Sequence, residues 1–282
     1  MFGGFNACLP FLNDVWLLSD ANGLGTPAWT QLSPAGTPPI PRLFHSAVYD
    51  AANNRMIVFG GEANTGPTGA LNDVWVLSHP NGLGGTPTWT LLTPTGGPPS
   101  PRFAHNAIYD PATNSMTVFG GIDITFAVFF NDVWVLSNAN GLGGPPTWTQ
   151  LTPTGGPPSP RAGQSAIYNP PTNRMTIFGG AACVFCGSPI LDDTWVLTDA
   201  NGIVTVPFAA FDAKAEIALR PRANDDAFEV KATFTLGPGS DGIAPLTEVV
   251  SLQVGSFSTT IPAGSFKVDK KGDSNSKGSS PA

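Results

Sequence analysis

Short apolar stretches, bounded by glycine, proline, asparagine or aspartate, recur along this chain. Arg55 to Phe59 is one of them, it ends on paired glycines, and near-copies begin at Met116 and Met175. β-Branched and aromatic residues at this length, between turn-forming residues, predict β-strands. A block ending in Asp-Val-Trp or Asp-Thr-Trp follows each copy, and its Trp residues lie 59, 59 and 61 residues apart: Trp16, Trp75, Trp134 and Trp195. This period indicates tandem repeats that bury their apolar faces against one another.

One repeat predicts four strands, which in the second copy span residues 42–49, 55–59, 71–78 and 86–93. The Asn-Gly pair at 81–82 supplies a tight turn before the last strand, because both residues tolerate positive φ. The Pro-rich segment 94–101 is poor in N–H donors and therefore separates one sheet from the next. The pattern predicts successive four-stranded meanders and requires no helix.

The paired glycines, the Asp-Val-Trp strand that follows them and the second Trp after a further loop resemble the kelch repeat of β-propellers. The resemblance extends over residues 1–205 and implies sheets arranged as radial blades around a central channel. About four blades are expected, and the last, from Arg161, has Phe208 where the others carry their second Trp. An arc of four blades would leave an apolar face at each end, so we expect part of a longer ring. The alternative is a small closed ring completed by residues 213–219.

The composition changes near residue 205. No lysine precedes Lys214, no tryptophan follows Trp195, and the repeat pattern stops. Strand-like segments continue over residues 206–268 and resemble a β-sandwich-like module attached to bacterial repeat proteins. Residues 269–282 are polar and rich in glycine and serine, which predicts a disordered tail. The expected fold is all-β: kelch-type blades over 1–205, then a small β-rich domain, then the tail.

The net charge of −7, with no cluster of basic residues, argues against nucleic-acid binding. No apolar run reaches the 18 or so residues of a membrane-spanning helix, so we expect no membrane insertion. The N-terminus has no signal-peptide pattern. The compartment stays open, and an extracellular or cell-surface location is favoured if a signal sequence precedes this chain.

Arginine recurs directly after each Pro-rich segment, as Arg42, Arg102 and Arg161. In a propeller these residues would form a ring of guanidinium groups that binds an anion, or each would bond to carbonyls or a carboxylate of a neighbouring blade. The scaffold role is favoured, because residues present in every repeat usually serve the scaffold.

Three residues after each arginine stand His45, His105 and Gln164. Glutamine in the third copy, with no cysteine or carboxylate recurring beside it, argues against a metal site. We therefore expect neither a metal nor a cofactor.

An aspartate recurs in every Trp block: Asp14, Asp73, Asp132 and Asp193. The four carboxylates form a ring in one interpretation. In the other, which we favour, each accepts backbone N–H groups at the end of a loop, as aspartate does in turns.

The loops between the second and third strands differ most between copies, and recognition is expected there. Residues 122–130 are unusually apolar for a loop, and four of them are candidate contact residues: Asp123, Phe126, Phe129 and Phe130. Alternatively, this loop packs on its own blade or on a neighbour. Cys183 and Cys186 lie in the next such loop and are candidates for a local disulfide in an oxidising compartment, in preference to a redox pair or a zinc site.

Two functions from different classes follow. The favoured one is a non-enzymatic binding or scaffold protein that presents its variable loops to a protein or glycan partner. The alternative is a propeller enzyme similar to galactose oxidase, whose copper-radical chemistry requires tyrosine, histidine and cysteine around one metal. Here Tyr49, Tyr109 and Tyr168 recur at one repeat position, as packing residues do. We therefore predict no catalytic residues.

Overall fold

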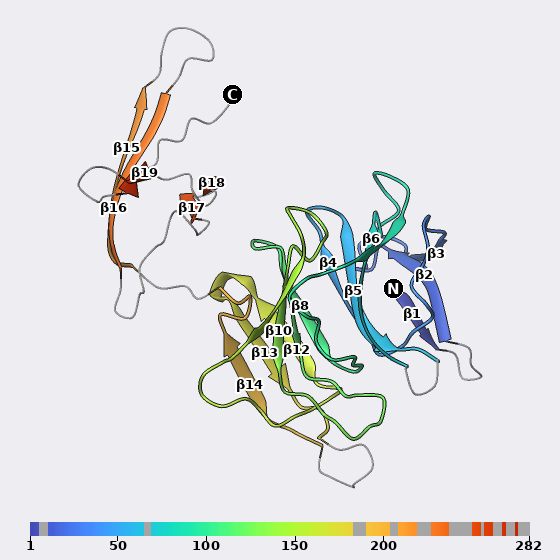
Figure 1. The fold of residues 1–282 in the computed structure, drawn as a ribbon. Helices are drawn as coiled ribbons and strands as arrows, with labels where there is room; N and C mark the ends of the chain where they lie inside the picture. Colours follow the sequence, from blue (N-terminus) through green and yellow to red (C-terminus); the bar gives the residue numbers. More distant parts are fainter. Residues whose placement is uncertain are drawn as a thin grey trace. The chain divides into compact units, whose positions relative to one another are not determined.

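The computed structural model describes residues 1–5, 11–64, 69–182 and 190–203, together with the backbone of six strands beyond residue 207 (Figure 1). The chain divides into two compact units, Met1–Ile203 and Val204–Ala282. The first unit consists of four antiparallel sheets, and the second contains three two-stranded antiparallel ladders.

The four sheets of the first unit, which we call blades 1 to 4, are meanders in which strands adjacent in sequence are adjacent in the sheet. Blade 1 contains β1 (Phe2–Phe5), β2 (Phe11–Ser19) and β3 (Ala28–Leu32). Blade 2 contains β4 (Ser46–Asp50), β5 (Arg55–Glu62), β6 (Ala70–Ser78) and β7 (Thr88–Leu92). Blade 3 contains β8 (Asn106–Asp110), β9 (Ser115–Phe119), β10 (Val133–Ser137) and β11 (Thr147–Leu151). Blade 4 contains β12 (Ser165–Asn169), β13 (Arg174–Phe178) and β14 (Thr194–Thr198), and a 3-10 turn, Pro170–Thr172, joins its first two strands.

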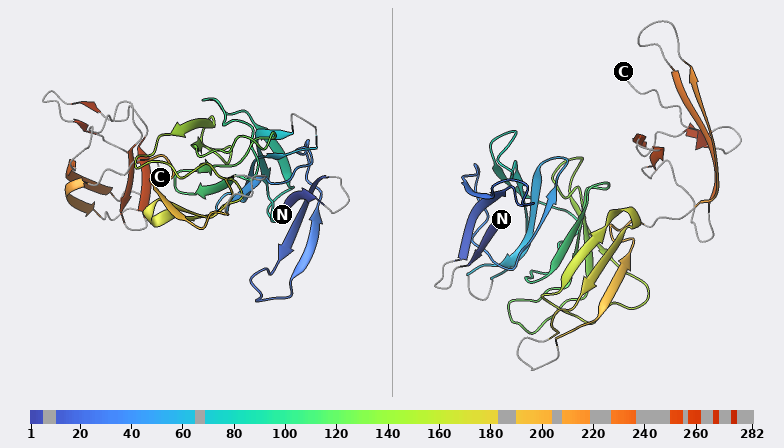
Figure 2. Two further views of the ribbon diagram at one scale, coloured as in Figure 1. Left: turned by 90° about the horizontal axis from the view of Figure 1, so that it is seen from below. Right: turned by 180° about the vertical axis from the view of Figure 1, so that it is seen from behind.

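The expected all-β, kelch-type arrangement of about four blades is confirmed, because the sheets stand face to face (Figure 2). One detail differs from the prediction for the glycine pairs. The strand β5 does not stop at Gly60 and Gly61 but continues to Glu62, with a register shift at the glycines.

Phe208 is expected in the fourth strand of the last blade, and in the alternative interpretation residues 213–219 close a small ring, but residues 208–218 form one strand of a separate two-stranded sheet. Phe208 opens β15 (Phe208–Ala218), which pairs with β16 (Ala227–Leu236) and not with β14. The physical reason is length: β16 offers ten residues for ladder hydrogen bonds, whereas β14 has five.

The core of the first unit lies between blades rather than inside any one of them. We call the face that a blade turns to the next blade its forward face, and the opposite one its rear face. The forward face of blade 2 and the rear face of blade 3 share one buried cluster: Ile57, Phe59, Val74, Val76, Met116, Val118, Leu136, Ala139 and Trp148. Successive residues of β5 point to opposite faces, and both faces are covered. This explains why the strand is apolar throughout rather than alternating.

The same aromatic contact recurs at successive blade junctions. The Phe59 ring lies 5.1 Å from the Trp148 ring, and the Phe2 ring lies 4.9 Å from the Trp89 ring. In both cases a phenylalanine of the second strand meets the tryptophan of the next blade's fourth strand. In blades 2 and 3 the second Trp of the repeat, Trp89 or Trp148, therefore joins the blade to the preceding one.

Thr117 makes a buried polar link between blades 3 and 4, since its hydroxyl donates to the carbonyl oxygen of Ala200 at 2.6 Å. Replacing Thr117 by valine is expected to lower the free energy of unfolding by about 1–3 kcal/mol, because the carbonyl stays buried without its donor. Thr149→Val, an exposed threonine of β11, is the matched control, with an expected change within about 0.5 kcal/mol. Urea unfolding followed by tryptophan fluorescence measures both. Equal effects of the two substitutions would contradict the role assigned to this bond.

The second unit is described as backbone only. Its three strand pairs are β15–β16, β17 (Val250–Val254) with β18 (Phe257–Ile261), and β19 (Lys267–Val268) with β20 (Ser274–Asn275). The assignment of this region to a sandwich-like module stays a prediction. The short strand β20 lies within residues 269–282, for which a disordered tail is expected.

Candidate binding surface between blades 2 and 3

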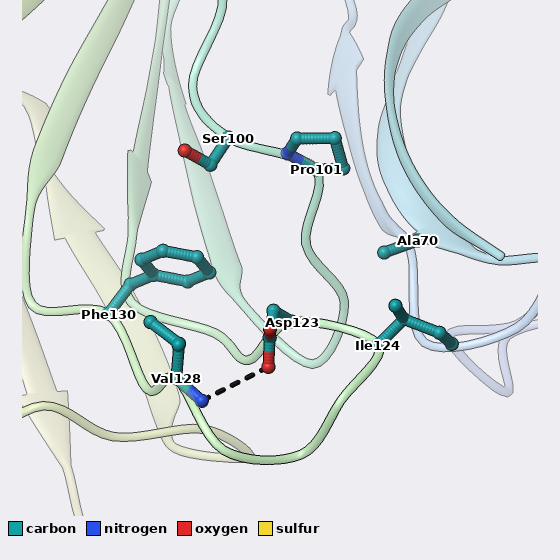
Figure 3. Close-up of a pocket in the computed structure, with 7 residues that line it drawn as sticks. All are labelled: Ala70, Ser100, Pro101, Asp123, Ile124, Val128 and Phe130. Carbon is teal, nitrogen blue, oxygen red and sulfur yellow. Dashed lines mark hydrogen bonds between the residues drawn. The ribbon is translucent and has the colours of Figure 1, made fainter. Parts of the chain in front are cut away.

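A hollow of about 520 Å³ opens beside the junction of blades 2 and 3 (Figure 3). Three separate parts of the chain line it: the start of β6, the Pro-rich segment between the blades, and the loop from β9 to β10. The lining residues are Ala70, Ser100, Pro101, Asp123, Ile124, Val128 and Phe130. Two of the sequence-predicted contact residues, Asp123 and Phe130, are among them.

Asp123 shapes the loop rather than offering a free charge. Its carboxylate accepts hydrogen bonds from the Thr125 hydroxyl at 2.7 Å and from the backbone N–H groups of Val128 and Ala127 at 3.1 and 3.3 Å. Partial burial acts to raise the pKa of this carboxyl, but these hydrogen bonds outweigh it and hold the pKa below its usual value. The Asp123 side chain therefore holds the loop in a fixed turn through these hydrogen bonds.

The aromatic residues of the loop are partly buried against neighbouring residues. Phe126 and Phe129 pack against a cluster of Phe103, Ile122 and Ala162, and the Phe126 ring lies 5.4 Å from the Phe103 ring. Packing of the loop on its own blade and its neighbours, the alternative considered from the sequence, thus accounts for these two side chains. Among the large apolar residues of the loop, Val128 is the exposed one, at 49%.

The three repeated arginines belong to the scaffold. Arg42, Arg102 and Arg161 are completely buried, and each guanidinium forms a two-pronged ion pair with an aspartate: Asp73, Asp132 and Asp193 respectively. The partner lies in the same blade, not in a neighbouring one as expected, and the guanidinium groups do not form an exposed ring. The neighbouring blade is reached by the main chain instead: the Arg102 carbonyl accepts from the Gly61 N–H of blade 2.

The repeated aspartates also accept hydrogen bonds from side-chain donors, which their interpretation as acceptors for backbone N–H groups at a loop end did not include. Asp73 accepts from the Arg42 guanidinium and from the Trp75 indole N–H, the latter at 2.7 Å. Asp14, for its part, accepts from the indole of Trp16. Asp73 lies in β6 beside the register shift opposite the paired glycines, and side-chain donors satisfy its carboxylate.

His105 and Gln164 occupy the same repeat position, and each lies at a junction between two blades. Nε2 of His105 lies 2.9 Å from the Ser46 hydroxyl, and Nε2 of Gln164 donates to the Phe119 carbonyl at 3.0 Å. In the part of the chain that the structure describes, no group of three or more histidine, cysteine, aspartate or glutamate residues is placed to hold a metal ion. These side chains therefore act between blades.

Tyr109 and Tyr168 pack against the clusters between blades, as expected, whereas Tyr49 is 48% exposed. The hydroxyl groups of Tyr49, Tyr109 and Tyr168 each donate to the asparagine five residues later, at 3.0–3.1 Å. They stand on three different blades, so they do not converge on one site. Cys183 and Cys186 lie outside the described residues.

The sequence analysis did not single out Ala70, Ser100, Pro101, Ile124 or Val128. Pro101 and Ser100 belong to a segment read only as a sheet breaker, and Ala70 is a small residue 53 positions before Asp123. The sequence signal that was available is the apolar run 122–130 itself, which contains Ile124 and Val128.

Antiparallel meanders of three or four strands stacked face to face, three of them with an arginine–aspartate pair at the same repeat position, define a β-propeller repeat protein. A family model described as the KLHDC2/KLHL20/DRC7 Kelch-repeats domain matches residues 1–203, and the chain belongs to the kelch-repeat family.

Among curated relatives, human host cell factor 2 is 30% identical over 190 residues, which is 64% of this chain and 22% of that protein. Human host cell factor 1 is 27% identical over 208 residues, which is 70% of this chain and 9% of that protein. The chain thus spans less than a quarter of the length of either relative. A chain of the solved structure titled "Cryo-EM structure of RAG in complex with one melted RSS and one unmelted RSS" aligns with a TM-score of 0.43 and 11% identity, over 89% of this chain and 71% of that chain.

Within the described residues, no helix is both long enough and apolar enough to cross a membrane.

Proposed function

We propose that this protein is a non-enzymatic binding scaffold, and that the hollow between blades 2 and 3 takes an apolar segment of a protein partner. The observation that carries the proposal is the exposed Val128 on a loop held in a fixed turn, at the edge of a hollow lined by Ile124 and Phe130. A preformed concave surface with apolar walls loses little conformational entropy when a partner binds.

A protein partner is favoured over a glycan because the lining has few free polar groups. Its polar side chains are those of Ser100 and Asp123, and the Asp123 carboxylate already accepts three hydrogen bonds. A sugar needs several hydrogen-bond partners for its hydroxyl groups, whereas an apolar peptide side chain needs contact area. The repeated arginines and tyrosines are engaged in the scaffold, which supports binding rather than catalysis.

The test uses a displayed library of random peptides, panned on the immobilised full chain. We expect the enriched peptides to contain clustered apolar residues. The best of them should bind the Val128→Asp variant at least about tenfold more weakly than the parent chain, a loss of about 1.4 kcal/mol in binding free energy. Calorimetry with the purified variants measures this. Val128→Asp suits the test better than deletion of the loop, because deletion would also remove Ile122, which is buried.

Leu24→Asp is the matched control, since Leu24 is an exposed apolar residue of the turn between β2 and β3, on a different blade. It should bind the peptide as the parent chain does. Equal binding by Val128→Asp, or a library that yields no enriched sequence, would overturn the proposed site.

A further inference from the structure

The two end blades expose residues that the inner blades bury. Phe178, on the forward face of blade 4, is 55% exposed, whereas Phe59 and Phe119 at the same repeat position are at most 3% exposed. Ile167 of the same face is 71% exposed, and its equivalent Ile108 is 5% exposed. Blade 4 therefore presents an apolar surface of the kind that forms a blade junction.

Blade 1 presents the opposite half of such a junction on its rear face. Trp29 of β3 is 55% exposed, while the equivalent Trp89 and Trp148 are 4% and 2% exposed. Leu18 of β2 lies on the same face and is only partly covered, although its equivalents Leu77 and Leu136 are completely buried.

The inner junctions show how these two surfaces fit. At the junctions of blades 1 and 2 and of blades 2 and 3, a forward-face phenylalanine meets a rear-face tryptophan, with ring centroids 4.9 Å apart for Phe2 and Trp89 and 5.1 Å apart for Phe59 and Trp148. Phe178 and Trp29 are the phenylalanine and the tryptophan that a further junction of this design would bring together.

A polar pair sets the register of the inner junctions and has its counterpart at the ends. The Asn140 amide donates to the Asp50 carboxylate at 2.6 Å, and the Asn201 amide donates to the Asp110 carboxylate at 2.7 Å. The same repeat positions hold Asn22 on blade 1 and Asn169 on blade 4. The Asn22 amide N–H and the Asn169 amide oxygen are a complementary donor and acceptor.

We propose that the forward face of blade 4 binds the rear face of blade 1 in a second copy of this chain, and that two copies form a closed head-to-tail dimer. The occupant is identified by continuity with the junctions already present. Blade 1 carries the leucine found at all three inner junctions, and the tryptophan and the asparagine that each occur at two of them. Each copy has four blades, and propellers have about four to eight, so two copies reach a ring of eight. Closing the ring buries the exposed faces of blades 1 and 4 in both copies, through two identical junctions.

The test is the mass of the full chain in solution at about 50 µM, by light scattering after gel filtration, a concentration well above a micromolar dissociation constant. The parent chain should have about twice the monomer mass of 29.2 kDa. Phe178→Asp and Trp29→Asp should each be monomeric, because each removes one half of both junctions. An equimolar mixture of the two variants should form dimers again, since one junction is then intact. Leu24→Asp should remain dimeric, because the equivalent Leu83 and Leu142 are not buried in the inner blades.

The thermal midpoint of each variant, followed by circular dichroism, establishes that it is folded. A monomeric parent chain would overturn the proposal. So would a Trp29→Asp variant that still dimerises, which would mean that like faces pair, and so would a mixture that stays monomeric.

Discussion

Replacing Arg102 by leucine is expected to lower the free energy of unfolding by about 3–5 kcal/mol, toward the lower end of that range. The guanidinium is completely buried, pairs with Asp132 through both terminal nitrogens, and donates to the carbonyl of Gly120. Leucine removes all of these donors and leaves the carboxylate without its counter-charge. Asp132 keeps 23% of its side chain exposed, so water relieves part of the loss.

Urea unfolding measures the effect, and a double variant separates the ion pair from simple packing. Arg102→Leu combined with Asp132→Leu should be more stable than Arg102→Leu alone, because no uncompensated carboxylate remains. Arg174→Leu, an exposed arginine at the start of β13, is the matched control and should change stability by at most about 0.5 kcal/mol. A loss below about 1 kcal/mol for Arg102→Leu would mean that this pair contributes no more than a surface salt bridge does.

The same substitution links stability to the proposed binding surface. The Arg102 guanidinium lies 4.1 Å from the centre of the Phe130 ring, and Phe130 lines the hollow. Arg102 therefore packs against Phe130, which lines the hollow, and also bonds to Asp132 of its own blade. We expect Arg102 to affect the affinity for a partner by fixing the position of Phe130, without contacting the partner itself.

Strand content is predictable from this sequence because the repeat supplies several copies of each signal. The predicted strands 71–78 and 86–93 agree with β6 (Ala70–Ser78) and β7 (Thr88–Leu92) to within two residues. The first strand of blade 2 was placed at residues 42–49, whereas β4 begins at Ser46. The reason is that Phe44 has a φ of +53°, which is not a strand conformation.

That left-handed conformation is held by a contact between blades, which a single stretch of sequence does not show. The Phe44 carbonyl accepts from the Ala104 N–H of the next blade, and Ala104, at the same repeat position, has the same φ. The third copy has Gly163 there, with a φ of +69°. This glycine is the one sequence hint that the position is not extended.

The candidate site is less predictable than the fold. The apolar loop 122–130 is visible in the sequence, but the hollow also needs Ala70 and Ser100, which come near it only when two blades stack. The arginine–aspartate pairs join residues about 30 positions apart, and the sequence does not indicate which aspartate each arginine contacts. The local sequence pattern therefore predicts the strands. Which polar side chains remain available to bind a partner depends on the contacts between strands and blades.

Stability at mildly acidic pH is expected to depend on His45 and His105. Burial, and then the neighbouring Arg102, lowers the pKa of His105 to about 3, and burial, and then Arg42, lowers the pKa of His45 to about 4. In the unfolded chain both should titrate near 6.5. Between these values the unfolded state binds more protons, so stability is lost as the pH falls from about 6.5, by up to about 1.4 kcal/mol per pH unit for each histidine.

The chain itself supplies the substitution that tests this. Gln164 occupies the equivalent position on blade 4 and cannot be protonated in this range, yet its amide bonds to the preceding blade at Phe119, as the His105 ring bonds to the preceding blade at Ser46. We expect the double variant His45→Gln and His105→Gln to keep its stability at pH 7.5 within about 1 kcal/mol. We also expect it to lose most of the decline between pH 6.5 and 4.5.

Urea unfolding at several pH values measures the slope, and His79→Gln, the matched change at the third histidine, should retain it because His45 and His105 are still present. The carboxyl groups of Asp132 and Glu62 do not produce a loss in this window. The pKa of Asp132 is lowered, since its hydrogen bond with Arg102 outweighs burial, so its contribution disappears only below its ordinary value near 3.8. Burial raises the pKa of Glu62, which acts in the opposite sense. An undiminished decline in the double variant would show that acid acts on groups other than the two histidines between the blades.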